Sequence, residues 1–114
     1  VYSHFHPSVL RTLQRLVKEC HKYNKPTSIC GEMAGDPLSA ILLMAMGFNT
    51  LSMSSSNILR VRKAICHISM TDAQALLEKV VKMNNPLTVQ SWMEYHFKTH
   101  GLADMVKSSR MLTV

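Results

Sequence analysis

The chain has 114 residues, of which 46% are hydrophobic and 18% are charged, and this balance excludes an intrinsically disordered protein. The net charge of +6 permits anionic partners, but the basic residues follow the spacing of solvated helical faces and do not gather on one recognition helix. The three cysteines Cys20, Cys30 and Cys66 show no CxxC spacing, which argues against a disulfide framework and favours the reducing cytoplasm. We expect no signal peptide and no membrane contact, because the longest apolar run covers only residues 40–46.

The first half of the chain alternates helix and strand signals. Residues 7–23 predict an amphipathic helix, with Pro7 at its first position and apolar residues three and four apart. Residues 27–30 are partly β-branched and bounded by Pro26 and Gly31, which favours a strand, and residues 31–35 read as a loop with two glycines.

The next helix and strand have clear boundaries. Asp36 provides an N-cap and Pro37 a first helical residue, and the helix Pro37–Met46 is apolar nearly all round, which indicates burial on more than one face. Gly47 ends it. Residues 50–53 alternate polar and apolar side chains, as a strand does.

Three further helices are expected after a polar turn at residues 54–57. They cover residues 58–68, then the stretch from the capping box Thr71-x-x-Gln74 to about Met83, then the stretch from Asn85-Pro86 to about His100, with a stop at Gly101. Residues 108–114 read as a loose tail.

Helix–strand alternation predicts two parallel strands, which cannot form a stable sheet alone because both edges and both faces need cover. The sequence is therefore interpreted as the end of a larger α/β structure. In a two-stranded sheet Ile29, Leu51 and Met53 are expected to face an open side, so that the isolated chain would self-associate, swap elements or be partly unfolded.

The residues best suited to take part in a reaction follow the first strand. Cys30 stands at the carboxyl end of that strand, the edge of a parallel sheet where ligands bind, and the other reading of this thiol is a small buried hydrophobe. Gly31 would let backbone amides approach an anion. Glu32 would orient substrate, or would pair with a neighbouring basic side chain.

Two histidine pairs have spacings that make them candidate metal ligands. His4 and His6 lack a third ligand nearby, and His6 is expected to fix the loop that enters the first helix. His96 and His100 are one helical turn apart without the context of a metal motif, and we expect them at the surface.

Residues 30–37 resemble the Cys-Gly-Glu-x-Ala-Gly-Asp motif of enzyme I of the bacterial phosphotransferase system. The resemblance extends to His6-Pro7-Ser8-Val9-Leu10-Arg11, to residues 42–48 and to Leu51-Ser52-Met53-Ser54, and it covers roughly residues 1–70. The variants Met-Ala-Gly-Asp-Pro and Met-Ala-Met-Gly-Phe look most like the nitrogen-regulatory type.

The resemblance implies a phosphoenolpyruvate-binding (β/α)8 barrel, of which residues 1–107 would supply the last two strands and the C-terminal helices. It implies a phosphotransferase that moves the phosphoryl group of phosphoenolpyruvate to an enzyme histidine and then to a histidine-containing carrier protein. Cys30 would protonate the pyruvate enolate, with Gly31 and Glu32 near the substrate. Mg²⁺ would be held by residues outside this sequence, as would the phosphorylated histidine, and a homodimer is implied.

Two alternatives stay open at this stage. One is a pyruvate-phosphate dikinase or phosphoenolpyruvate synthase relative, because these enzymes share the cysteine loop and the barrel. The other is a non-enzymatic basic helical module for binding or dimerisation, which would explain the charge but lacks an aromatic platform for nucleic acid.

Overall fold

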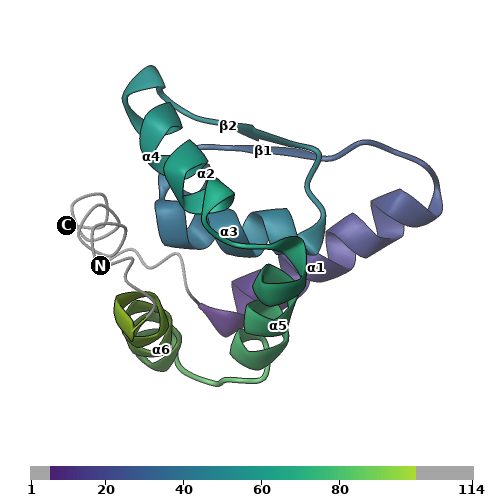
Figure 1. Cartoon of the computed structure of the whole chain (residues 1–114). Coiled ribbons are helices and arrows are strands. Elements are labelled where there is room, and N and C mark those ends of the chain that lie inside the picture. The colour runs from purple at the N-terminus through teal and green to yellow at the C-terminus, as the bar shows by residue number, and fades with distance from the viewer. Residues whose placement is uncertain (1–5, 100–114) are drawn as a thin grey trace.

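The computed structural model describes residues 6–99, and helices and strands alternate in its first half as expected (Figure 1). The elements are α1 (Pro7–Lys22), β1 (Ser28–Cys30), α2 (Glu32–Gly35), α3 (Pro37–Met46), β2 (Thr50–Ser52), α4 (Ser55–Cys66), α5 (Met70–Val80) and α6 (Pro86–Thr99). The expected stop at Gly101 and the tail of residues 108–114 lie outside the described residues.

The two strands pair in parallel, which confirms the expected strand direction. Ile29 lies opposite Leu51, and both side chains pack against the hydrophobic core. The expectation that these two residues face an open side is therefore wrong, because the helices cover that face of the sheet. The opposite face is exposed and carries small polar side chains, namely Ser28, Cys30, Thr50 and Ser52.

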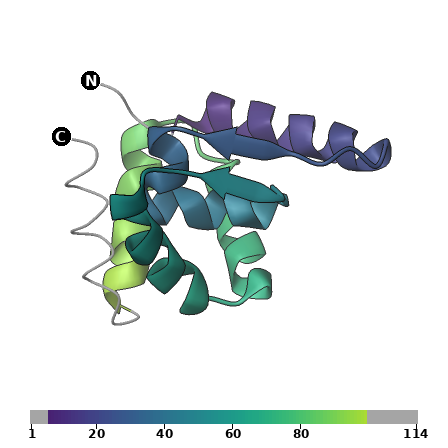
Figure 2. The ribbon, with the colours of Figure 1, turned by 90° about the horizontal axis from the view of Figure 1, so that it is seen from above.

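Helix α3 is the centre of the structure and contacts α1, α2, α4 and α5. Figures 1 and 2 show it lying along the strands with the other helices around it. Its residues are buried except for the half-buried Met44, as its uniform apolarity predicts. Asp36 caps its first turn, and Gly47 ends it with a left-handed conformation at φ +100°. Both boundary predictions are confirmed.

Helices α1 and α5 pack on α3, and α6 also buries one apolar face in the hydrophobic core. The buried members of these faces include Leu10 and Val17 of α1, Leu76 and Val80 of α5, and Val89, Met93 and Phe97 of α6. A long-range contact joins α1 to the segment just after α5. Arg11 Nη1 donates hydrogen bonds to the carbonyl oxygens of Val81 at 2.9 Å and Met83 at 3.3 Å. Arg11 therefore stabilises the carboxyl end of α5.

Three local predictions differ from the structure. Residues 32–35 form one helical turn, where a loop was expected. Helix α4 begins at Ser55, three residues earlier than predicted. Helix α5 is capped by Ser69, whose Oγ accepts a hydrogen bond from the Asp72 backbone N–H at 3.1 Å, so the capping box at Thr71 is wrong. Serine and threonine both cap helices well, and the local pattern alone does not choose between them.

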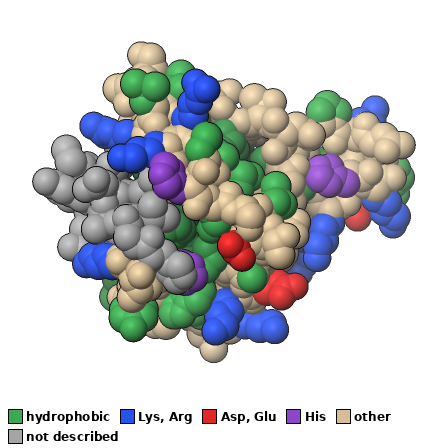
Figure 3. Space-filling view, in the orientation of Figure 1, with side chains coloured by type: hydrophobic (Ala, Val, Ile, Leu, Met, Phe, Trp, Pro, Cys, Tyr) green, Lys and Arg blue, Asp and Glu red, His purple; other side chains and the backbone are tan. Residues whose placement is uncertain are grey.

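The surface shows how the charge is distributed. On the face seen in Figure 3, Lys and Arg side chains lie in several separate groups. None of the helices between residues 6 and 99 combines the length and the apolar character needed to cross a membrane.

Candidate functional site

A cleft of about 410 Å³ lies at the carboxyl ends of the two strands. Its lining comes from both strand ends and from the helices that follow them: Cys30, Gly31, Glu32, Ser52, Met53, Ser54 and Asn57. The predicted site residues Cys30, Gly31 and Glu32 are therefore brought together at the edge of the sheet where parallel α/β proteins bind ligands. We call this the strand-end cleft.

The thiol of Cys30 is accessible in the strand-end cleft. Cys30 is the last residue of β1 and lies opposite Ser52, and both side chains are exposed. The reading of Cys30 as a small buried hydrophobe is thus wrong, because the alternation of the strand turns Ile29 inward and Cys30 outward. The thiol is open to a molecule that enters the cleft.

The chain leaves β1 through Gly31, which starts α2. Gly31 has φ +102°, a conformation that residues with side chains rarely adopt, and a Cβ added there would meet no atom within 4 Å. The backbone at Gly31 is therefore uncovered beside the thiol. Glu32 is exposed in the first turn of α2, and within residues 6–99 no ion pair forms at its carboxylate. Pairing of Glu32 with a neighbouring basic side chain, the alternative reading, does not occur there.

Sequence reasoning missed the opposite wall of the cleft, which comes from the start of α4. The amide Nδ2 of Asn57 donates to Ser54 Oγ at 3.1 Å, and this hydroxyl also lies 3.1 Å from Ser56 Oγ. A Cβ on Gly35 would come within 2.9 Å of Asn57 Nδ2, so only glycine lets α2 pack this closely on Asn57. The available signal was the position of residues 54–57 directly after a strand, at the same sheet edge as Cys30.

Asp36 stabilises the start of α3 and does not line the strand-end cleft. Its side chain is fully buried and accepts hydrogen bonds from Leu38 N at 3.3 Å and from Ser39 Oγ at 2.9 Å. These bonds confirm its predicted role as the N-cap of α3. Because α2 ends directly before Asp36, the cap also holds α2 against α3.

The histidines considered as metal ligands have other contacts. His6 Nδ1 lies 2.7 Å from Ser8 Oγ and accepts from Ser8 N at 3.3 Å, which confirms that it fixes the entry into α1, while His4 and His100 lie outside the described residues. His96 is half-buried between Trp92 and Phe97, so it is less exposed than the surface position expected for it. In the part of the chain that the structure describes, no three His, Cys, Asp or Glu side chains are grouped to hold a metal ion.

Known proteins are similar to this chain over most of its length. Residues 1–70 match the family model described as PEP-utilising enzyme, PEP-binding domain. The Bacillus subtilis phosphoenolpyruvate-protein phosphotransferase is 32% identical over 98 residues, which are 86% of this chain and 17% of that protein. The protein of the same name from Latilactobacillus sakei is 37% identical over 84 residues, or 74% of this chain and 15% of that protein.

A third relative, from Salmonella typhimurium, is named phosphoenolpyruvate-dependent phosphotransferase system and is 29% identical over 107 residues, or 94% of this chain and 14% of that protein. The chain thus spans 14% to 17% of the length of these curated relatives. Because the family model covers more than half of the sequence, including every residue that lines the strand-end cleft, the chain belongs to the PEP-utilising enzyme family and matches its PEP-binding domain.

Proposed function

We propose that this sequence supplies two neighbouring strands of the phosphoenolpyruvate-binding (β/α)8 barrel of a phosphoenolpyruvate-protein phosphotransferase. The observation that carries the proposal is that all residues of the strand-end cleft fall inside the family match. The relatives named above are phosphotransferases, so we assign the phosphotransferase reaction and its partners, phosphoenolpyruvate and a histidine-containing phosphocarrier protein.

The exposed surfaces of the described residues support a barrel. In a (β/α)8 barrel, one face of each strand contacts helices and the other faces the barrel interior. Here Ile29 and Leu51 contact the helical core, whereas the face bearing Cys30 and Ser52 is exposed. Helix α1 also exposes Val9 and Leu16, which are 46% and 53% accessible, although its other apolar face is buried. A neighbouring strand and helix would cover both surfaces.

In this proposal Cys30 is the proton donor. Transfer of the phosphoryl group breaks the bond between phosphorus and the enol oxygen of phosphoenolpyruvate and leaves the enolate of pyruvate. Carbon C3 of the enolate then takes the proton of the Cys30 thiol, which gives pyruvate and a thiolate. The thiolate regains a proton from solvent. An exposed thiol at the cleft suits this step, and a positioned general acid contributes about 10²- to 10⁴-fold in rate.

The remaining cleft residues would bind and orient the substrate. The uncovered backbone at Gly31 would approach an anionic group, and Glu32 would orient the substrate or a water molecule. Glu32 is the one carboxylate among the cleft residues, so the described residues do not form a magnesium site. We therefore assign no step to Mg²⁺, whose ligands the resemblance places outside this sequence.

The expected setting is the cytoplasm, since the three cysteines are unpaired in the structure. The implied homodimer and the nitrogen-regulatory type stay predictions. Light scattering of the protein that carries this sequence checks the first, and the identity of the carrier that it phosphorylates checks the second.

The test places this sequence in the matching region of the Bacillus subtilis phosphotransferase and measures pyruvate formed from phosphoenolpyruvate with the carrier present. We expect turnover by the chimera and a loss of about 10²- to 10⁴-fold in Cys30→Ala. Cys66→Ala is the matched control, because Cys66 is also exposed but lies at the far end of α4. A chimera that melts cooperatively yet forms no pyruvate would contradict the phosphotransferase assignment. Undiminished turnover in Cys30→Ala would contradict the proton-donor role alone.

A further inference from the structure

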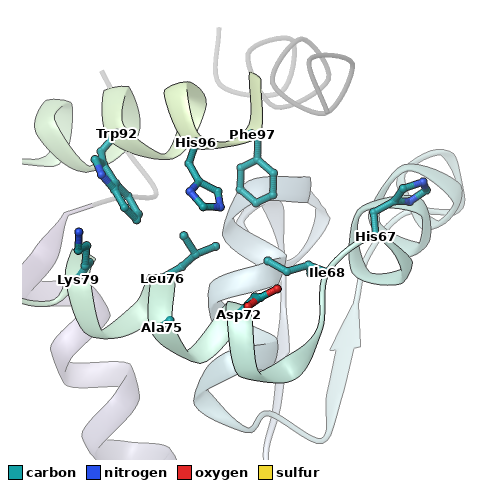
Figure 4. Close-up of a pocket in the computed structure, with 9 residues that line it drawn as sticks. All are labelled: His67, Ile68, Asp72, Ala75, Leu76, Lys79, Trp92, His96 and Phe97. Atoms are coloured by element: carbon teal, nitrogen blue, oxygen red, sulfur yellow. The ribbon is translucent and has the colours of Figure 1, made fainter. Parts of the chain in front are cut away.

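A second cavity, of about 380 Å³, lies between α5 and α6 (Figure 4). Its lining comes from both helices and from the turn before α5: His67, Ile68, Asp72, Ala75, Leu76, Lys79, Trp92, His96 and Phe97. It shares no residue with the strand-end cleft. We call it the α5–α6 cavity, and its size falls in the range of pockets that hold small molecules.

One wall of the α5–α6 cavity is aromatic. Trp92, His96 and Phe97 extend from α6 toward α5 (Figure 4), with the His96 ring 5.5 Å from the Trp92 ring and 5.6 Å from the Phe97 ring. Leu76 of α5 lies across from them. These surfaces suit the apolar body of a ligand, and one aromatic ring would fit between them.

The other determinant is the charge at one end of the cavity. Lys79 Nζ lies 5.6 Å from the centre of the Trp92 ring, and among residues 6–99 no carboxylate pairs with this ammonium group. The acidic lining residue Asp72 is seven positions earlier on α5, about 10 Å away along the helix axis. An anion beside Lys79 would therefore gain a cationic partner without direct contact with Asp72.

We propose that the α5–α6 cavity binds a small organic anion, namely a carboxylate with an aromatic or aliphatic body. The body would lie between Leu76 and the aromatic residues of α6, and the carboxylate would accept hydrogen bonds from Lys79 Nζ. Charge complementarity supports this occupant, because Lys79 supplies a cation to the lining and no carboxylate among residues 6–99 pairs with it. The inference rests only on α5 and α6 and does not depend on the reaction proposed for the strand-end cleft.

Trp92 makes the test specific, since it is the one tryptophan in the sequence. Phenylacetate is titrated into the 114-residue chain while the Trp92 fluorescence is measured, with phenylacetamide as a neutral probe of the same shape. We expect a saturable change with a dissociation constant on the order of a millimolar, the affinity that about ten non-hydrogen atoms support. The neutral amide should bind about five- to tenfold more weakly, because it lacks the charge that Lys79 recognises.

Variants identify the cavity as the site. Lys79→Met should weaken phenylacetate binding about five- to tenfold. Lys82→Met is the matched control, because Lys82 is an exposed lysine just after α5 that does not line the cavity, and its affinity should be unchanged. Ala75→Leu should weaken phenylacetate binding by narrowing the cavity.

Several results would overturn the proposal. One is a fluorescence change that does not saturate, and another is equal affinity for the amide or in Lys79→Met. A signal that depends on protein concentration without phenylacetate would instead assign the cavity to a second copy of the chain. A folded chain with no response to phenylacetate would mean that the cavity does not take a free anion.

Discussion

Replacement of Gly47 by alanine tests how the end of α3 positions β2 beside β1. Gly47 adopts φ +100°, and the chain then turns so that the Asn49 backbone N–H donates to the Thr27 carbonyl at 3.0 Å. The Asn49 side chain in turn accepts from the Thr27 backbone N–H at 2.8 Å. These bonds lead into β2 and so place Ser52 opposite Cys30. The conformation of Gly47 thus contributes to the strand-end cleft as well as to stability.

The structure indicates the size of the effect. A residue with a side chain in the left-handed region costs about 1–2 kcal/mol. The new Cβ would also lie 2.8 Å from His21 Cε1, but His21 is exposed in the last turn of α1 and its ring can move. We therefore expect Gly47→Ala to lower the free energy of unfolding by about 1–2 kcal/mol, mostly through backbone strain.

Urea unfolding followed by circular dichroism at 222 nm measures this free energy, with His21→Ala and the double variant completing a cycle. We expect His21→Ala to recover only a few tenths of a kcal/mol in the Gly47→Ala background. Gly47→Asn should cost less than Gly47→Ala, because asparagine tolerates this conformation better. The reasoning is refuted if Gly47→Ala is as stable as the parent chain, or if His21→Ala restores its full stability.

Two further substitutions probe the cleft and the packing of the helices. Gly35→Ala should displace the Asn57 side chain and so change the rate at which iodoacetamide alkylates Cys30. Peptide mass spectrometry measures this rate, with Cys66 as the internal control. The rate should return toward that of the parent in Gly35→Ala/Asn57→Ala, and an unchanged Cys30 rate in Gly35→Ala would argue against this contact. Arg11→Met should lower the free energy of unfolding by about 1 kcal/mol, since two carbonyl groups after α5 lose their donor. Thermal melts check this, with Arg15→Met as the control because Arg15 is an exposed residue of the same helix. Equal stability of the two variants would contradict the prediction.

The sequence by itself determined the features that depend on residues close together along the chain. The start of α1 at Pro7, the cap at Asp36, the end of α3 at Gly47 and the helical start at Pro86 all follow from local backbone chemistry. The parallel strand direction follows from the helix between the strands, because a short turn cannot join parallel strands. The motif from Cys30 to Pro37, together with the similar segments before and after it, also indicated the family to which the chain belongs.

Only the tertiary structure decided which side chains meet. Asn57 and Gly35 are 22 positions apart, and Arg11 lies 70 positions from the Val81 carbonyl that it binds. The partial burial of His96 likewise depends on α6 lying beside α5, which no periodicity within α6 specifies. Ile29 faces the core and Cys30 the cleft because the helices cover one face of the sheet, and this choice of face is a property of the packed molecule.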